Sequence, residues 1–113
     1  MKHHLYLQIA SKLRTKILRG DYAPEQQIPS IRKLAENEKC NPATVQKAMK
    51  VLEEQNLVTS CETLGYFVIA SEQKIKELRY QESNKLVKIL FEKLGELGFS
   101  EDEIVDLFFR KDA

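Results

Sequence analysis

The strongest constraint on the fold of this chain is a pair of amphipathic helical patterns separated by a turn of only a few residues. In the second pattern the apolar side chains recur at i, i+3, i+4 and i+7, which places them on one buried face. These side chains are Val45, Ala48, Met49 and Leu52. Asn41 can cap the first amides, and Pro42 suits the first helical position because its missing N–H would have no partner there. The pattern predicts a helix from Pro42 to Gln55.

The neighbouring segments predict two helices before this one and a hairpin after it. Apolar spacing predicts a long helix over residues 4–19, and Ser30 can cap a short helix over residues 30–37. Two β-branched and aromatic segments, residues 57–61 and 65–70, are predicted to form strands joined by a tight loop. Helix, helix, short turn, helix and hairpin is the order of a winged helix-turn-helix. The predicted fold is therefore mainly α with a small β-hairpin wing.

The outer face of the helix from Pro42 to Gln55 carries short hydrogen-bonding groups near its start. In a winged helix-turn-helix this end of the second helix of the motif lies in the DNA major groove. Ala43 could then contact a thymine methyl group, while Thr44 and Gln46 could bond base edges or phosphates. An amphipathic helix with a merely solvated outer face would explain the same pattern, so both interpretations stay open here.

Charge is unevenly distributed along the 113 residues, although the whole chain carries a net charge of only +1. Residues 1–70 contain ten Lys/Arg against seven Asp/Glu, a net +3, and residues 71–113 contain eight against ten, a net −2. A basic front and an acidic back suit a DNA-binding part joined to an assembly part. The sequence thus predicts a DNA-binding domain over residues 1–70 and a dimerisation region over residues 71–113.

The C-terminal region has the pattern of two helices with a large apolar surface. Gly98 can end the first of them, and Ser100 with Glu103 forms a capping box that begins the second. An apolar surface too large for one chain to bury usually marks a partner. We therefore expect a homodimer, with packing of this region on the wing domain as the alternative. The predicted dimerisation residues are Leu86, Ile89, Leu90, Leu94, Leu97, Ile104, Leu107 and Phe108.

A string of residues at fixed spacing runs through the first part of the chain. Its members include Gln8, Ile9, Ala10, Leu13, Arg14, Gly20, Pro24, Pro29, Ser30, Arg32, Leu34, Ala35, Thr44, Val45, Gly65, Tyr66, Phe67 and Val68. By this string, residues 5–69 resemble the DNA-binding domain of the GntR family of bacterial transcription regulators. The segment from Asn41 to Val45 and the short tail resemble the YtrA subfamily in particular. This resemblance implies a homodimeric repressor that binds an inverted repeat in double-stranded DNA.

The helix pattern and the resemblance together nominate the residues that contact DNA. The resemblance implies that Arg32 contacts a phosphate or a guanine, and that the wing loop reaches the minor groove. Lys47 adds attraction to phosphates whatever the sequence. The predicted DNA-binding residues are Ser30, Arg32, Asn41, Pro42, Ala43, Thr44, Gln46, Lys47, Thr63 and Gly65.

Two acidic residues depart from the family pattern. Glu25 stands where the family usually has glycine after the connector proline, so the turn there is expected to differ in conformation. Glu62 stands in a wing loop that usually reads Arg-Gly-x-Gly, and a carboxylate near phosphates is repelled. A winged-helix protein–protein adaptor that has lost DNA binding is therefore the alternative function.

Other classes of function find little support in the sequence. His3 and His4 have no carboxylate partner nearby in sequence, and no Gly-rich phosphate loop, Cys-x-x-Cys or His-Glu-x-x-His motif is present. Cys40 and Cys61 each stand alone, and Cys40 is expected in the core. We expect no catalysis, no metal and no cofactor, and nothing names an effector. No long apolar run or signal-peptide pattern occurs, so a cytoplasmic location away from membranes is expected.

Overall fold

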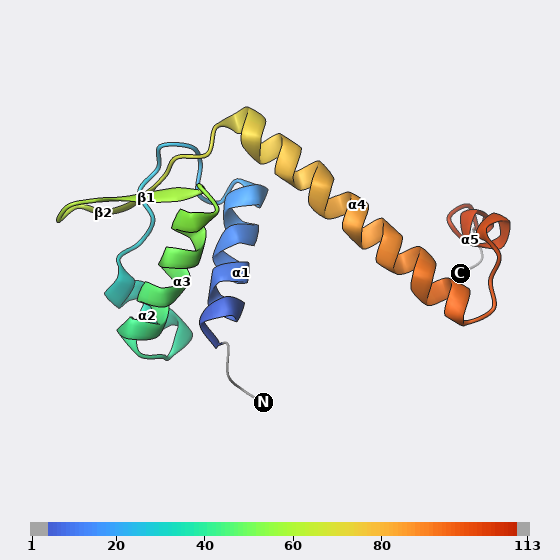
Figure 1. The fold of residues 1–113 in the computed structure, drawn as a ribbon, viewed down its shortest axis with the longest axis horizontal. Coiled ribbons are helices and arrows are strands. Elements are labelled where there is room, and N and C mark those ends of the chain that lie inside the picture. The colour runs from blue at the N-terminus through green and yellow to red at the C-terminus, as the bar shows by residue number, and fades with distance from the viewer. Residues whose placement is uncertain (1–4, 111–113) are drawn as a thin grey trace. The chain divides into compact units, whose positions relative to one another are not determined.

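The computed structural model describes residues 5–110, which form five α-helices and one two-stranded antiparallel sheet (Figure 1). The elements are α1 (Leu5–Arg19), α2 (Ile31–Glu38), α3 (Pro42–Glu54), β1 (Val58–Cys61), β2 (Gly65–Val68), α4 (Glu72–Glu96) and α5 (Glu101–Leu107). The predicted order of elements, mainly helical with a small hairpin, is confirmed. None of the helices over residues 5–110 combines the length and the apolar character that a membrane crossing requires.

The described residues separate into two compact units, one that ends at Lys76 and one that begins at Glu77. The division lies six residues beyond the boundary predicted from charge, within α4 rather than before it. The reason is Ile75, which lies in the first turn of α4 and is only 7% exposed. This side chain makes the start of α4 part of the core of the first unit.

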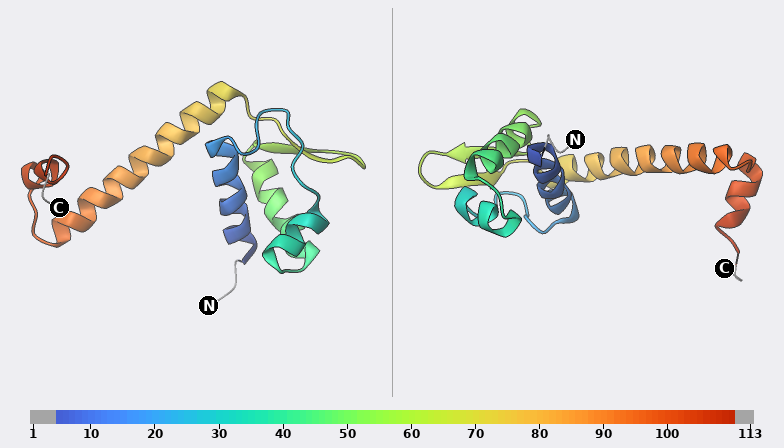
Figure 2. Two further views of the ribbon diagram at one scale, coloured as in Figure 1. Left: turned by 180° about the vertical axis from the view of Figure 1, so that it is seen from behind. Right: turned by 90° about the horizontal axis from the view of Figure 1, so that it is seen from below.

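The core of the first unit lies where α3 packs between α1 and α2 (Figure 2). The apolar stripe predicted on α3 is confirmed, since all four of its side chains are fully buried. Facing them are Ile9, Ala10, Leu13 and Ile17 of α1, and Leu34 and Ala35 of α2. A helix buried along one stripe exposes its opposite face, so this packing turns the polar face of α3 to solvent.

Two side-chain caps set the start of the helix-turn-helix elements. The Oγ of Ser30 accepts the backbone N–H of Lys33 at 3.1 Å at the start of α2. The Oδ1 of Asn41 accepts the N–H of Ala43 at 2.8 Å, with Pro42 in the first position of α3. Both caps predicted from the sequence are therefore confirmed.

The wing is wider than the predicted hairpin because the connector between α1 and α2 pairs with it. The backbone N–H of Ile28 donates to the carbonyl of Tyr66 at 2.9 Å. The N–H of Glu25 donates to the carbonyl of Val68 at 2.8 Å, and Val68 returns a bond to the carbonyl of Gln26 at 3.0 Å. The connector, predicted only as a turn, thus lies along the outer side of β2.

Glu25 adopts a backbone conformation that glycine would adopt more readily. Its φ is +71°, in the left-handed region, where the Cβ of an L-residue is crowded. The turn at Glu25 therefore has a backbone conformation that suits the glycine of the family pattern, and not the different conformation expected from the sequence.

We expect Glu25→Gly to raise the free energy of unfolding by about 0.5–1 kcal/mol. Glycine removes the steric cost of the left-handed conformation, and part of this gain is offset because glycine loses more conformational entropy on folding. Urea unfolding followed by circular dichroism measures the change. Glu25→Ala removes the same charge but keeps the Cβ, so it should bring no such gain. Equal stabilisation by both variants would assign the effect to charge and contradict the backbone explanation.

The second unit consists of the rest of α4 and α5. Ser100 and Glu103 form the predicted capping box, with the N–H of Ser100 bonded to Glu103 Oε1 at 2.9 Å and the N–H of Glu103 bonded to Ser100 Oγ at 3.2 Å. Ile104, predicted as a dimerisation residue, is only 2% exposed and is therefore buried within the single chain. Its side chain stabilises the fold and cannot contribute to an intermolecular surface.

Candidate nucleic-acid interface

The N-terminal half of α3 presents the predicted reading surface. The side chains of Asn41, Ala43 and Gln46 are exposed, as are those of Pro42 and Lys47. Thr44 is half-buried, so Gln46 is the more accessible of the two hydrogen-bonding side chains predicted to read bases. The dipole at this end of the helix favours a phosphate.

A groove of about 430 Å³ brings this surface together with the wing. One wall holds the cap of α2, one holds α3, and one is the wing. Its lining residues are Pro29, Ser30, Ile31, Gln46, Ser60, Glu62, Thr63, Leu64, Gly65 and Tyr66. Four predicted DNA-binding residues, from three separate parts of the sequence, therefore line one groove. They are Ser30, Gln46, Thr63 and Gly65.

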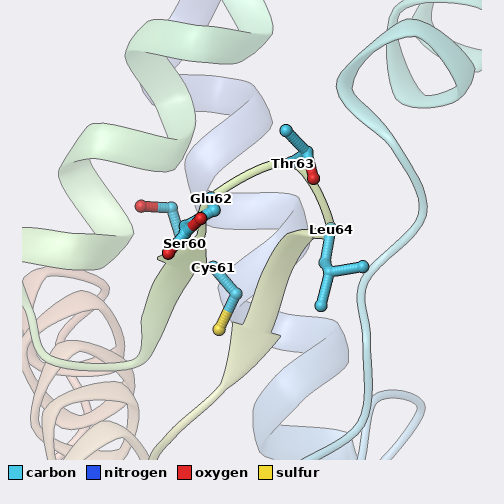
Figure 3. Close-up of a pocket in the computed structure, with 5 residues that line it drawn as sticks. All are labelled: Ser60, Cys61, Glu62, Thr63 and Leu64. Atoms are coloured by element: carbon cyan, nitrogen blue, oxygen red, sulfur yellow. The ribbon is translucent and has the colours of Figure 1, made fainter.

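The wing loop forms a second, shallower hollow of about 580 Å³ (Figure 3). The labelled side chains project in different directions, Ser60 and Cys61 from the end of β1 and the other three from the loop (Figure 3). Leu64 is 66% exposed, so the loop presents an apolar side chain together with the carboxylate of Glu62. Gly65 has a φ of +113°, which explains a glycine at this position. The wing loop thus exposes an acidic and an apolar side chain but no basic one.

Basic side chains lie on the helices of the same unit. Arg32 and Lys47, both predicted to contact DNA, are exposed. The Nζ of Lys47 lies 5.8 Å from the ring centroid of Tyr6, within the range of a cation–π contact. Tyr6 of α1 is half-buried, and through this contact it meets α3. Positive charge therefore comes from α2 and α3, and not from the wing loop.

Tyr66 is a groove residue that the sequence pattern did not nominate. Burial raises the pKa of its hydroxyl above the ordinary value, and the carboxylate of Glu53 raises it further. The phenol hydroxyl can donate a hydrogen bond from the wall of the groove. In the sequence Tyr66 fits an ordinary strand residue. Its place in the wall of the groove follows only from how the wing, α2 and α3 come together in the fold.

The cysteines and histidines add no further site to the described residues. Cys40 is half-buried rather than fully in the core, Cys61 is exposed at the end of β1, and both are free thiols. Among residues 5–110 no three His, Cys, Asp or Glu side chains gather as a metal site would require. His3 and His4 lie outside the described residues.

The sequence model of the gntR family of bacterial regulatory proteins matches residues 5–68, more than half of the chain. The chain belongs to the GntR family. The matched region begins with α1 and ends with β2, so it contains the helix-turn-helix, the wing and the groove between them. As a member of this family, the protein is a DNA-binding transcription regulator.

Two GntR-type regulators of Bacillus subtilis (strain 168) resemble the chain. It is 26% identical over 102 residues to the HTH-type transcriptional regulator YhcF, a match that covers 90% of this chain and 84% of YhcF. It is 33% identical over 64 residues to the HTH-type transcriptional repressor YtrA, covering 57% of this chain and 49% of YtrA. The second match spans about half of YtrA. The predicted resemblance to the GntR family and to YtrA is confirmed.

Solved structures show the same fold. A GntR family transcriptional regulator from Listeria monocytogenes superimposes with a TM-score of 0.87 at 23% identity, over 98% of this chain and 97% of its own. A transcriptional regulator from Oenococcus oeni gives a TM-score of 0.81 at 25% identity, over 96% and 90%. The DNA-binding domain of AraR in complex with operator ORR3 gives 0.55 at 30% identity, over 56% and 76%. The predicted winged helix-turn-helix is thereby confirmed.

Proposed function

We propose that this GntR-family regulator is a homodimeric repressor that binds an inverted-repeat operator through α3 and the wing. The observation that carries the proposal is the groove in which Ser30, Gln46 and the wing loop meet. Elements that read adjacent grooves of DNA must present their contact residues on one side of the protein, and this groove joins them there. Solved AraR complexes with operators, at 30% identity, support DNA as the ligand.

The division of roles follows from exposure and charge. Gln46 is the main candidate for reading a base edge, because its exposed amide can donate to and accept from a base. Arg32 and Lys47 would contact phosphates, which contribute affinity without sequence preference. Ser30 would support the amides at the start of α2, and Thr63 with Gly65 would bring the wing loop against the DNA backbone. Asn41, Pro42, Ala43 and Thr44 complete the proposed surface.

The homodimer is supported by apolar side chains that α4 and α5 leave exposed. Leu86 is 65% exposed and Leu97 is 74% exposed, although both are large and apolar. The exposed members of the predicted set are Leu86, Ile89, Leu90, Leu97 and Phe108, while Leu94 and Leu107 are half-buried. A second copy would cover this surface, and two-fold symmetry of the protein would impose an inverted repeat on the operator. Ile104 is excluded from the surface because it is already buried.

Repression is proposed from the relative YtrA, which is named a transcriptional repressor. The effector, if the protein has one, is not indicated by any described residue.

Selection of duplexes from a random DNA library with the 113-residue chain tests the proposal. We expect the enriched sequences to be inverted repeats, and we expect log affinity to fall linearly with log salt concentration as phosphate contacts release counterions. A reporter gene placed behind the selected operator should be repressed by the protein. A chain that enriches no sequence and shows no salt-dependent binding would instead be the protein–protein adaptor.

The charge of Glu62 provides a separate prediction for the wing. If the loop lies beside the DNA backbone, Glu62→Arg should tighten binding to operator and random DNA alike, with the larger gain at low salt. The slope of log affinity against log salt should steepen by roughly one per subunit for each phosphate newly contacted. The gain should also be larger with A-tract flanks, whose narrow minor groove attracts arginine. Fluorescence anisotropy at two salt concentrations, with two flanking sequences, measures these changes.

Glu54→Arg is the matched control for that experiment. Glu54 is an exposed carboxylate at the C-terminal end of α3, so the variant makes the same change in charge away from the wing. Similar effects of the two variants, with no preference for A-tract flanks, would show that the wing is held away from DNA.

A further inference from the structure

The connector between α1 and α2 holds the wing loop through one side chain. The Nε2 of Gln27 donates a hydrogen bond to the backbone carbonyl of Leu64, a residue 37 positions further along the chain. Gln27 also forms an antiparallel bridge with Phe67 of β2, and the next residue, Ile28, bonds to the carbonyl of Tyr66. Because this pairing holds the backbone of Gln27 against β2, its side chain extends to the loop from a fixed position.

The loop itself has little packing to hold it in place. Within the loop, the N–H of Leu64 bonds to the carbonyl of Cys61 at 2.8 Å. The side chains of Glu62, Thr63 and Leu64 are exposed, so burial contributes little to their position. A bond from outside the loop therefore has a large share in fixing where its backbone lies.

Gly65 leaves the space that this contact needs. A Cβ added at Gly65 would lie 3.2 Å from the Nε2 of Gln27, closer than most carbon contacts in proteins. Glycine is thus favoured at this position for two reasons, its positive φ and the close approach of the Gln27 amide. The loop and the connector fit each other at this point.

We propose that Gln27 is a positioning residue for DNA recognition: its amide holds the wing loop so that Thr63 lies at the groove with Ser30 and Gln46. The inference rests on the proposed function, because it assumes that the wing contacts DNA. A loop held in its bound geometry loses less conformational freedom on binding, which favours affinity. Gln27 does not line the groove and need not touch DNA itself.

Gln27→Met tests the role, since methionine has a similar length but neither donates a hydrogen bond nor adds charge. In the 113-residue chain without DNA, amide hydrogen exchange at residues 63–65 should become faster, while exchange in α3 stays unchanged. Binding to the selected operator should weaken about two- to tenfold, the range that corresponds to one net hydrogen bond. Thr63→Ala should then cost less affinity in the Gln27→Met background than in the wild-type background.

Gln26→Met is the matched control, because the Gln26 side chain accepts the N–H of Ala23 at 2.9 Å rather than contacting the wing loop. It should leave both the exchange of the loop and operator binding unchanged. Unchanged loop exchange in Gln27→Met would overturn the proposal. A loosened loop with unchanged affinity would also overturn it, and would show that the wing plays no part in binding while α3 still does. Failure of the wild-type chain to select any DNA would refute the proposed function before any variant is made.

Discussion

A chain that ends at Lys76 is expected to be a monomer that binds a single operator half-site. It keeps the winged helix-turn-helix and its whole core, because Ile75 is retained, but loses the exposed apolar surface of α4 and α5. Linking two binding modules typically raises the overall affinity by about 10²–10⁴-fold, so the truncated chain should bind the full operator more weakly by that factor. Sedimentation equilibrium and anisotropy titration measure the two effects separately.

A point variant of the 113-residue chain controls for the loss of residues. Leu86→Glu places a charge in the proposed dimer surface and should have nearly the effect of truncation. Tyr80→Glu changes another exposed side chain of α4 that is outside the predicted dimer set, and it should leave the dimer intact. A truncated chain that still sediments as a dimer, or binds the full operator undiminished, would show that the dimer surface lies in the first unit.

The second large effect is expected at α3. Gln46→Ala should weaken binding to the selected operator by about 1–3 kcal/mol per subunit, the value of a good base contact, and hardly affect binding to random DNA. The reason is geometric, since Gln46 is exposed on α3 at the wall of the groove that it shares with the wing. Competition titrations of operator against random duplex measure the specificity ratio directly.

Lys47→Ala supplies the contrast, because an ammonium group that contacts phosphate contributes to all sequences alike. It should weaken binding to operator and random DNA by the same factor and reduce the salt slope by roughly one per subunit. If Gln46→Ala also lowers both affinities equally, then Gln46 is a backbone contact and base reading belongs to other residues of α3.

Much of the helix-turn-helix could be predicted from sequence because its determinants are local. The caps at Ser30 and Asn41, and the capping box of Ser100 with Glu103, each join residues two or three positions apart. The buried stripe of α3 repeats with the period of the helix itself. Such features are contained in windows of a few residues, which is why the predicted helices agree with the structure to within about two residues at their ends.

The site and the limits of the core depended on contacts between distant residues. The pairing of Gln27 with the wing loop, the groove shared by Ser30 and Gln46, and the contact of Lys47 with Tyr6 all join separate elements. No local pattern marks such pairs, because each residue alone fits a plain turn, cap or helix face.

The order of the elements, their ends and the polar face of α3 can therefore be read from local sequence patterns. That Ile75 completes the first core, that Ile104 is buried within the chain, and that the connector pairs with the wing becomes visible only in the folded chain. Burial and sheet pairing depend on which surfaces meet in space. A hydrophobic or polar pattern indicates which side chains can be buried or can form hydrogen bonds. The packing of the helices and strands against one another decides which residues those side chains contact.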